Sequence, residues 1–357
     1  MPHDVYILGR GLASAAGADL AAALESIRAG TVIPGTLCAA PGIEWPYFAI
    51  PEDHDNWYTR ARSIVSRVVT EAGPNLDRQA PLFVASSSLN VGALEAGAPF
   101  LRDCQTFVEQ VASWIEWRGP VYWVSTACTS AVNAILGAKQ MIRCGAADHA
   151  LVLGMELHNA FSCAGFGGMQ LLDTHTPRPL ALDRNGIVLG EAVAALYLGN
   201  EKARWRLRGG ANIVDGSSPA GATRAAVSRM VSEALTDSAS VAGEIGLVKV
   251  QAAGSVRNDA EEIQGLREQF GVLPPLATLK TCLGHTLGAA GAAELVLLTA
   301  AIEAGVWPRL PPLSFDPEIE AVCTGKLPRV RLILANILGF GGGHAGVVVE
   351  DTLWSAA

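Results

Sequence analysis

Short apolar runs alternate along the whole chain with stretches of helical periodicity. The apolar runs predict strands at residues 5–8, 82–86, 121–126, 150–153, 193–198, 205–213, 247–252, 276–281, 331–338 and 345–350. The helical stretches cover residues 21–29, 129–143, 219–237, 259–270 and 288–304. Asn258 is the expected N-cap of the helix at 259–270, and Gly271 follows its end. This alternation predicts a layered α/β protein in which helices cover the sheets.

Two segments of the chain follow the same plan. The expected strand at 122–126 leads into Cys128 and then into a helix that begins with small side chains. The expected strand at 276–281 leads into His285 and then into the small residues at 286–291. If both halves of the chain share one architecture, Cys128 and His285 lie on opposite sides of one cleft.

Composition narrows the class of protein. Of the 357 residues, 50% are hydrophobic and 17% are charged, which is the reverse of a disordered chain. The net charge of −8, without a basic stripe, argues against nucleic-acid binding. Residues 119–138 and 332–349 lack charge, but polar residues and a glycine cluster make them poor membrane spans. We expect buried strands and core helices there instead.

Cysteine usage and the N-terminus bear on location. The seven cysteines are dispersed and include no CxxC pair, which is typical of reduced thiols in a cytoplasmic protein. The first residues lack the basic and apolar regions of a secretory signal. No metal-binding pattern and no cofactor motif is recognised, so we expect neither.

Cys128 is the strongest candidate nucleophile. It lies at a strand-to-helix turn, where the helix dipole and free N–H groups favour a thiolate and lower the thiol pKa. Its small neighbours leave the sulfur approachable, as in a nucleophile elbow. The alternative is a buried cysteine in a tight turn.

His285 is the favoured partner of Cys128 among the seven histidines. Lys280 precedes it by five residues, and a nearby ammonium favours a neutral imidazole that can donate a hydrogen bond or act as a base. Glu294 falls within an otherwise apolar helix, where a buried carboxylate needs a cation, and Lys280 is the candidate. The alternative for Glu294 is a solvated helix face.

A glycine cluster marks residues 336–345. Clustered glycines allow the backbone to approach a ligand closely, and an N–H group there could bind an oxyanion. A simple hairpin connection is the alternative. A phosphate-binding loop is excluded, because no Lys-Ser/Thr follows and no helix is predicted to start there.

Together these segments resemble the β-ketoacyl-acyl carrier protein synthase family, the elongating ketosynthases of the thiolase superfamily. Four blocks occur in the family's order: Thr126-Ala127-Cys128-Thr129-Ser130-Ala131, residues 178–192 with Asp183-Arg184-Asn185-Gly186 and Gly190-Glu191-Ala192, residues 280–294 with Gly284-His285-Thr286-Leu287-Gly288, and Asn336 to Ala345. The resemblance covers residue 121 to the C-terminus most clearly. It implies a thiolase-like fold, a layered α-β-α-β-α body of two similar halves, residues 1–204 with Cys128 and residues 205–357 with His285 and Phe340.

The resemblance also implies roles. Cys128 would take an acyl group as a thioester from the phosphopantetheine of an acyl carrier protein, and a malonyl unit would then decarboxylate and attack it. His285 would donate a hydrogen bond to the malonyl thioester oxygen, with Lys280 and Glu294 behind it. The backbone N–H groups of Cys128 and Phe340 would form the oxyanion hole, and the Phe340 ring would gate the acyl pocket. A homodimer or a heterodimer with another ketosynthase-like subunit is implied, in fatty-acid or type II polyketide biosynthesis, an aryl-polyene pathway included.

The chain departs from the family at one catalytic position. Where the family has a second histidine, this sequence has Ala253, and the chain resembles a divergent and shortened member of the family. His344, in the glycine cluster, is a candidate to compensate. Two alternatives therefore stay open: a Cys128-dependent acyltransferase that has lost decarboxylative condensation, and a non-catalytic partner subunit like a chain-length factor. We expect a local carrier-docking patch, with Arg60, Arg62 and Arg67 as candidates.

Overall fold

The structure is a computed structural model that describes residues 3–52, 54, 56–218, 221–308, 310, 313–323 and 330–355. Across these residues, ten strands form one sheet in the order β11-β10-β12-β13-β9-β1-β8-β6-β4-β5. They are β1 (Tyr6–Ser14), β4 (Leu82–Ala85), β5 (Val121–Val124), β6 (His149–Glu156), β8 (Ala192–Gly199), β9 (Trp205–Val214), β10 (Ile245–Lys249), β11 (Leu276–Ala277), β12 (Leu332–Leu338) and β13 (Gly343–Asp351).

One strand pattern occurs twice in this sheet. The first half of the chain forms the set β5-β4-β6-β8-β1, and the second half forms the set β11-β10-β12-β13-β9. In each set the first three strands are parallel, and the last two are each antiparallel to their neighbour. The two sets join only where Tyr6 and Ile7 of β1 pair with Arg206 and Trp205 of β9. The two sets have equivalent topology. The boundary between two structural halves at residues 204 and 205 stays a prediction.

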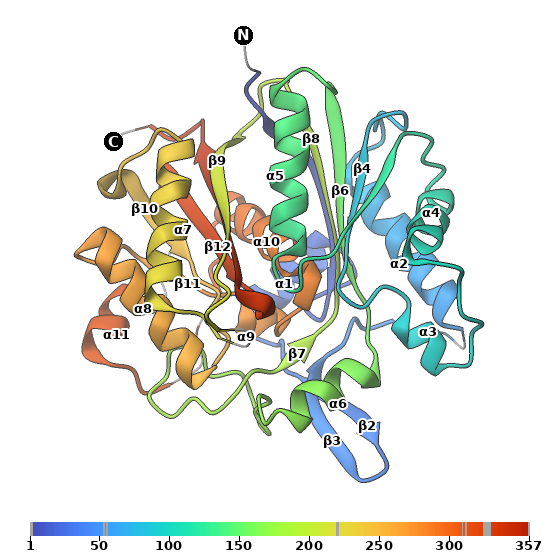
Figure 1. Ribbon diagram of the computed structural model, residues 1–357, viewed down its shortest axis with the longest axis horizontal. Helices are drawn as coiled ribbons and strands as arrows, with labels where there is room; N and C mark the ends of the chain where they lie inside the picture. Colours follow the sequence, from blue (N-terminus) through green and yellow to red (C-terminus); the bar gives the residue numbers. More distant parts are fainter. Residues whose placement is uncertain are drawn as a thin grey trace.

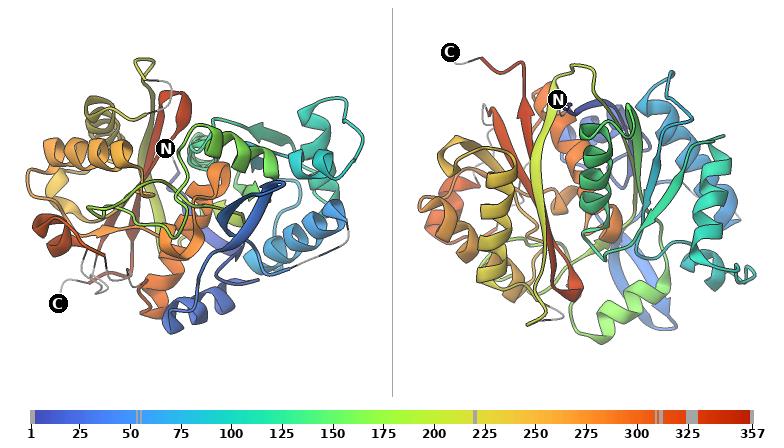
Figure 2. Two further views of the ribbon diagram at one scale, coloured as in Figure 1. Left: turned by 90° about the horizontal axis from the view of Figure 1, so that it is seen from below. Right: turned by 45° about the horizontal axis from the view of Figure 1, so that its top comes forward.

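Helices lie in three layers in the part of the chain that the structure describes (Figures 1 and 2). The central layer holds α5 (Ser130–Arg143) and α10 (Ala290–Ala304), which contact strands of both sets. The outer layers are α2 (Trp57–Ala72) with α4 (Cys104–Trp114) on the first set, and α7 (Arg224–Asp237) with α8 (Val256–Phe270) on the second. One hydrophobic cluster surrounds the central helices, and one lies between each outer pair of helices and its set of strands. The predicted thiolase-like layering is confirmed.

The remaining elements lie mostly around the ends of the strands. They are the small sheet of β2 (Gly35–Ala40), β3 (Ile43–Phe48) and β7 (Leu189–Gly190), the helices α1 (Leu20–Ala29), α3 (Val91–Glu95), α6 (Ala160–Gly168), α9 (Lys280–Leu283) and α11 (Pro317–Val322), and 3₁₀ turns at Ala242–Glu244, Leu287–Ala289 and Phe340–Gly342. The hairpin of β2 and β3 and helix α6 project together at one end of the body (Figure 1).

Several element boundaries differ from the sequence prediction. Helix α8 starts at Val256, and Ser255 caps it by accepting from the N–H of Asn258, so the predicted Asn258 cap is wrong. The Asn258 side chain instead accepts from the N–H of Ala222. Strand β11 ends at Ala277, and Lys280 begins the short helix α9 rather than ending a strand. The expected helix at 219–237 begins at Arg224, and residues 219–220 lie outside the described residues.

The apolar stretches have a structural explanation. Residues 119–138 contain β5 and much of α5, and residues 332–349 form the antiparallel pair of β12 and β13. Within the described chain, one helical stretch, Leu287–Ala304, is long and apolar enough to cross a membrane, and 78% of it is buried in the protein. It is apolar all round because it lies between the two sets of strands.

Two glycines let β1 lie directly against the backbone of α2. A Cβ atom added at Gly9 would lie 1.8 Å from the carbonyl oxygen of Ala72, and one at Gly11 would lie 2.0 Å from that of Val68. Both contacts are with backbone, which cannot rotate away. The position of the first sheet on α2 therefore depends on the absence of side chains here.

We expect Gly11→Ala to lower the free energy of unfolding by about 1–3 kcal/mol, because the added methyl group overpacks a rigid contact. Thermal unfolding followed by circular dichroism measures the change. Gly243→Ala is the control, since a Cβ atom there meets nothing within 4 Å. Equal unfolding midpoints for the two variants would contradict the prediction.

Candidate active site

Cys128 sits in a tight turn between β5 and α5. Ala127 adopts a positive φ of 52°, which turns the chain sharply just before the cysteine. The Ser130 hydroxyl accepts from the N–H of Thr126 at 2.9 Å and donates to the carbonyl of Ala127 at 2.6 Å, which closes the turn. Cys128 itself is buried and packs in a small cluster with Val132. The strained turn places its sulfur at the start of α5.

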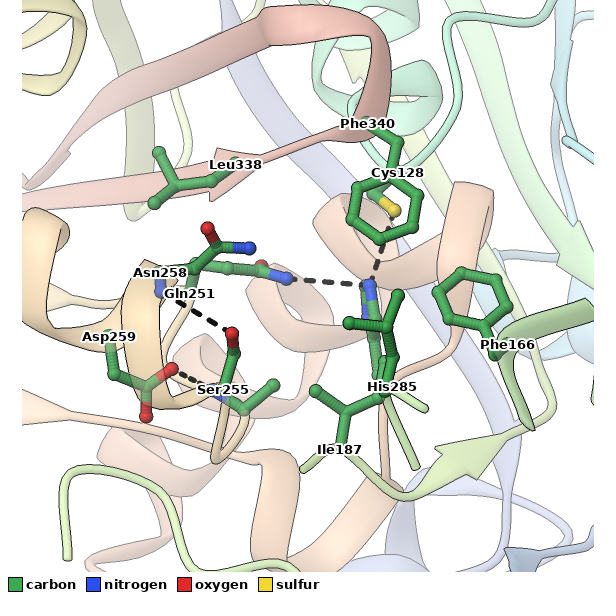
Figure 3. A pocket seen from close by; sticks show the side chains of 12 residues that line it. Cys128, Phe166, Ile187, Gln251, Ser255, Asn258, Asp259, His285, Leu338 and Phe340 are labelled. Atoms are coloured by element: carbon green, nitrogen blue, oxygen red, sulfur yellow. Dashed lines mark hydrogen bonds between the residues drawn. The ribbon is translucent and has the colours of Figure 1, made fainter. Parts of the chain in front are cut away.

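His285 is brought to Cys128 by the second half of the chain. Its backbone N–H donates to the carbonyl of Val188 at 2.7 Å, and its carbonyl accepts from the N–H of Gly190 at 3.1 Å. The ring then lies with Nε2 at 3.2 Å from Cys128 Sγ (Figure 3). The predicted juxtaposition across one cleft is present, although 157 residues separate the two in sequence.

Burial dominates the ionisation of Cys128. It raises the pKa of the thiol to about 11, against the opposing effect of hydrogen bonds from the backbone N–H groups of Phe340 and Cys128. The sequence predicts a lowered pKa from the helix N-terminus. That prediction is wrong for the free protein, because removing the sulfur from water outweighs the N–H groups. The resting pair is therefore a thiol and a neutral imidazole.

Glu294 lies between two lysines behind His285. Lys280 Nζ forms an ion pair with Glu294 Oε1, as predicted, and Lys249 Nζ lies 2.6 Å from Glu294 Oε2. All three side chains are buried. Burial would raise the pKa of Glu294, but the two ammonium groups outweigh it and the pKa lies below its ordinary value. Burial, then Lys280 and Lys249, hold the pKa of His285 well below its ordinary value.

Lys249 is a member of this cluster that the sequence did not predict. It is the last residue of β10, inside an apolar run that reads as a buried strand, and its Nζ also donates to the carbonyl of Asn336 at 2.7 Å. A lysine that interrupts a predicted buried strand was the available signal, because a buried charge requires a partner.

Two carboxylates fix the loop that follows β10. Glu262 accepts from the N–H groups of Gln251 at 2.7 Å and Ala252 at 2.8 Å, and from the Asn336 amide at 2.7 Å. Asp259 accepts from the N–H groups of Ala253 at 3.2 Å and Gly254 at 3.0 Å. Burial raises the pKa of Glu262 to about 7. Gln251 and Ala253 are held rigidly beside His285.

The glycine cluster forms the turn between β12 and β13. Gly341 and Gly342 have positive φ angles of 80° and 75°, and a Cβ atom at Gly342 would lie 1.8 Å from the carbonyl oxygen of Asp215. This turn brings Phe340 over Cys128, where its ring stacks on Phe166 with centroids 5.3 Å apart (Figure 3). The gating role of Phe340 stays a prediction.

These residues enclose one pocket of about 490 Å³, open solvent at its mouth included. Its lining comprises Cys128, Phe166, Leu171, Ile187, Gln251, Ala253, Ser255, Asn258, Asp259, His285, Leu338 and Phe340. The walls are mostly apolar, and Cys128 and His285 lie together in them (Figure 3).

Two residues do not have the roles that the sequence predicted for them. His344 does not line the pocket, because alternation along β13 places it on the face opposite Ala345, which packs in the cluster of Cys128. Arg60 is not a surface docking residue. It is buried, and its guanidinium bonds both carboxylate oxygens of Glu191, at 2.9 and 2.5 Å.

Comparison with known proteins agrees with this geometry. Residues 105–203 match the family model for the beta-ketoacyl synthase N-terminal domain, and residues 207–314 match that for the C-terminal domain. The chain belongs to the beta-ketoacyl synthase family. The family's two domain models meet close to the point where β9 begins, at Trp205.

Relatives in the family cover part of the chain. Nodulation protein E of Rhizobium sp. (strain N33) is 30% identical over 66% of this chain, and the match spans 63% of that protein's length. The tetracenomycin polyketide synthase ketoacyl synthase alpha subunit of Streptomyces glaucescens is 26% identical over 71% of this chain and 68% of that protein.

Solved structures share the fold over nearly the whole chain. A chain from the complex of a ketosynthase with its chain length factor, from Xenorhabdus doucetiae, superposes with a TM-score of 0.84 and 21% identity, covering 98% of both chains. A beta-ketoacyl synthase from Burkholderia phymatum gives a TM-score of 0.83 and 21% identity, covering 99% of this chain and 100% of that one.

We expect Glu294→Gln to lower the free energy of unfolding by about 3–5 kcal/mol, because it leaves two buried ammonium groups without a carboxylate. Denaturant unfolding at neutral pH measures the loss. Glu318→Gln is the matched control, since its ion pair with Arg267 is exposed to solvent. Its loss is expected to stay within about 1 kcal/mol. Similar losses in both variants would show that the buried cluster does not stabilise the fold.

The raised pKa of Cys128 predicts the pH dependence of its alkylation. Only the thiolate reacts, so the rate of modification by iodoacetamide should rise about tenfold per pH unit between about pH 7 and pH 10. Peptide mass mapping identifies Cys128, and the denatured chain serves as the control for an ordinary thiol. A plateau near the ordinary thiol pKa in the folded protein would contradict the burial argument.

Proposed function

We propose that the chain is a β-ketoacyl-acyl carrier protein synthase-like acyltransferase. It forms an acyl thioester on Cys128 and condenses it with a malonyl-type unit on a carrier protein. The observation that carries this proposal is the 3.2 Å contact of Cys128 Sγ with His285 Nε2 inside an apolar pocket. A nucleophile within hydrogen-bond reach of a base is the requirement for covalent catalysis.

The acylation step follows from the resting state of this pair. Cys128 is a thiol at neutral pH, and neutral His285 accepts its proton as the sulfur attacks the incoming thioester. The carrier thiol leaves and takes up the proton. The backbone N–H groups of Cys128 and Phe340 bind the oxyanion of the tetrahedral intermediate, a role supported by their hydrogen bonds to the sulfur.

In the condensation step, His285 acts as a donor. A neutral imidazole donates to the malonyl thioester oxygen on which negative charge develops, and burial, then the ammonium groups of Lys280 and Lys249, keep it neutral by lowering its pKa. The Phe340 ring, stacked on Phe166, gates access to the sulfur. Because acyl transfer and condensation are separate steps, the kinetics are ping-pong.

The partners in this proposal are an acyl carrier protein and a second ketosynthase-like subunit, identical or different. Strand β5 lies at the edge of the large sheet and exposes Tyr122 and Trp123. An uncovered edge strand with apolar side chains favours pairing with another chain. We place the reaction in the cytoplasm, in fatty-acid or type II polyketide biosynthesis. All seven cysteines are free thiols, which fits a reducing compartment.

One alternative function is supported by a specific residue. Ala253 offers no donor where the family has a second histidine, which favours a Cys128-dependent acyltransferase without decarboxylative condensation. The intact pair of Cys128 and His285 argues against the other alternative, a non-catalytic subunit like a chain-length factor.

Intact-mass measurement after incubation with an acyl-loaded carrier protein tests the proposal. We expect one acyl group on the wild-type chain and none on Cys128→Ala. Cys144→Ala is the matched control, because Cys144 is exposed and should not affect acylation. The acylated chain should then release carbon dioxide from malonyl-carrier protein.

Each outcome separates the functions. Without an adduct on Cys128, both enzymatic functions are rejected and a partner subunit is left. An adduct without carbon dioxide release rejects condensation and keeps the acyltransferase.

A further inference from the structure

The segment that leaves β10 presents alternate side chains to the active site. Val248, Val250 and Ala252 pack in the hydrophobic cluster beneath α7 and α8. The side chains between them face the other way. Lys249 reaches Glu294, and both Gln251 and Ala253 line the pocket. Position 253 therefore faces the reacting sulfur but carries only a methyl group, and Gln251 is the polar pocket residue next to it.

The Gln251 carboxamide points at His285. Its Nε2 lies 3.5 Å from His285 Nε2, and the side chain is 6% exposed (Figure 3). Among the described residues, Gln251 Oε1 has no hydrogen-bond partner although it is buried. A buried amide with an unpaired oxygen costs free energy. The unpaired oxygen is an acceptor, so the group that an oxyanion in this pocket could meet is Nε2, which already lies beside His285 Nε2.

The main chain that carries this side chain is fixed by hydrogen bonds. Glu262 accepts from the N–H groups of both Gln251 and Ala252, and it is fixed in turn by the Asn336 amide. A donor that is fixed before the reaction stabilises developing charge without reorganisation in the transition state. For Gln251 the backbone is fixed on both sides of the side chain, and the carboxamide lies against the His285 ring before any substrate binds.

We infer that Gln251 is a catalytic residue that supplies the second N–H donor to the malonyl thioester oxygen, in place of the histidine absent at position 253. The inference rests on the proposed condensing function. With Gln251 Nε2 and His285 Nε2 3.5 Å apart, one oxygen can lie about 2.9 Å from each and accept from both. Once Cys128 is acylated, the sulfur offers no proton to His285, so its Nε2–H tautomer is free to donate.

Decarboxylation and carbon–carbon bond formation together make up the condensation step. The bond between C2 of the malonyl group and its carboxylate breaks, carbon dioxide leaves, and the electron pair forms an enolate whose oxygen is held by Gln251 and His285. C2 then attacks the acyl carbonyl carbon on Cys128. The new carbon–carbon bond forms, the carbon–sulfur bond to Cys128 breaks, and the departing thiolate takes up a proton from water, which restores the resting thiol. No oxidant, reductant or metal is required.

Two other candidate donors do not serve the pocket. The ammonium of Lys249 is bonded to Glu294 and to the carbonyl of Asn336. His344 lies on the far face of β13 and does not line the pocket. Of the described pocket residues, Gln251 is the one whose side-chain amide lies within 3.5 Å of the His285 ring.

The test compares two half-reactions in Gln251→Leu and Gln251→Glu. Leucine removes the amide, and glutamate keeps its size but has no N–H donor. We expect acylation of Cys128, followed by intact mass, to stay within about threefold of wild type. Carbon dioxide release from malonyl-carrier protein should fall at least about 100-fold in both variants, the effect of losing one oxyanion donor. Gln264→Leu, at an exposed position on α8, is the matched control and should change neither rate.

Each other result overturns the inference. Carbon dioxide release within about threefold of wild type would show that Gln251 is not a donor. Equal losses in acylation and release would place its effect on Cys128 or on folding instead. If the wild-type chain is acylated but releases no carbon dioxide, the condensing function itself fails, and the donor role fails with it.

Discussion

The buried ion cluster of Glu294 with Lys249 and Lys280 is the interaction on which the rest of the site depends. Glu294 comes from the central helix α10, Lys249 from the end of β10, and Lys280 from α9. One carboxylate thus ties together three elements that meet behind His285. Charges buried this deeply are tolerated only when they are paired, so each member constrains the position of the others. Burial lowers the pKa of the neighbouring imidazole, and the two lysines of the cluster lower it further, so His285 is neutral.

Burial governs the chemistry at the front of the site. A cysteine at a helix start is usually activated by N–H groups, yet the enclosed pocket raises the thiol pKa to about 11. The resting pair is therefore a thiol beside a neutral His285 ring, and not a thiolate. An apolar, enclosed pocket also strengthens every hydrogen bond to developing charge. The enclosed pocket disfavours a charged resting state of either residue.

The duplicated topology explains how the two halves make one site. Each half contributes a strand followed by a reactive residue and a helix of small side chains, and these helices, α5 and α10, pack together in the central layer. Small residues permit that close approach: a Cβ atom at Gly291 of α10 would lie 2.5 Å from the Val132 side chain of α5. Cys128 and His285 meet because the helices that follow them are neighbours.

The sequence by itself determined the layered α/β class, Cys128 and His285 as the candidate pair, and the pairing of Lys280 with Glu294, because each is encoded in a short local motif. The tertiary structure decided the rest. Lys249 and Gln251 belong to the site although the sequence did not predict them, and His344 does not belong to it although it was a candidate. Which side of the sheet each side chain faces, at the end of β10, just after it and in β13, makes the difference. That face depends on register and on what packs against the sheet, which are long-range properties. The pKa of Cys128 likewise follows from enclosure by distant segments, which no local pattern records.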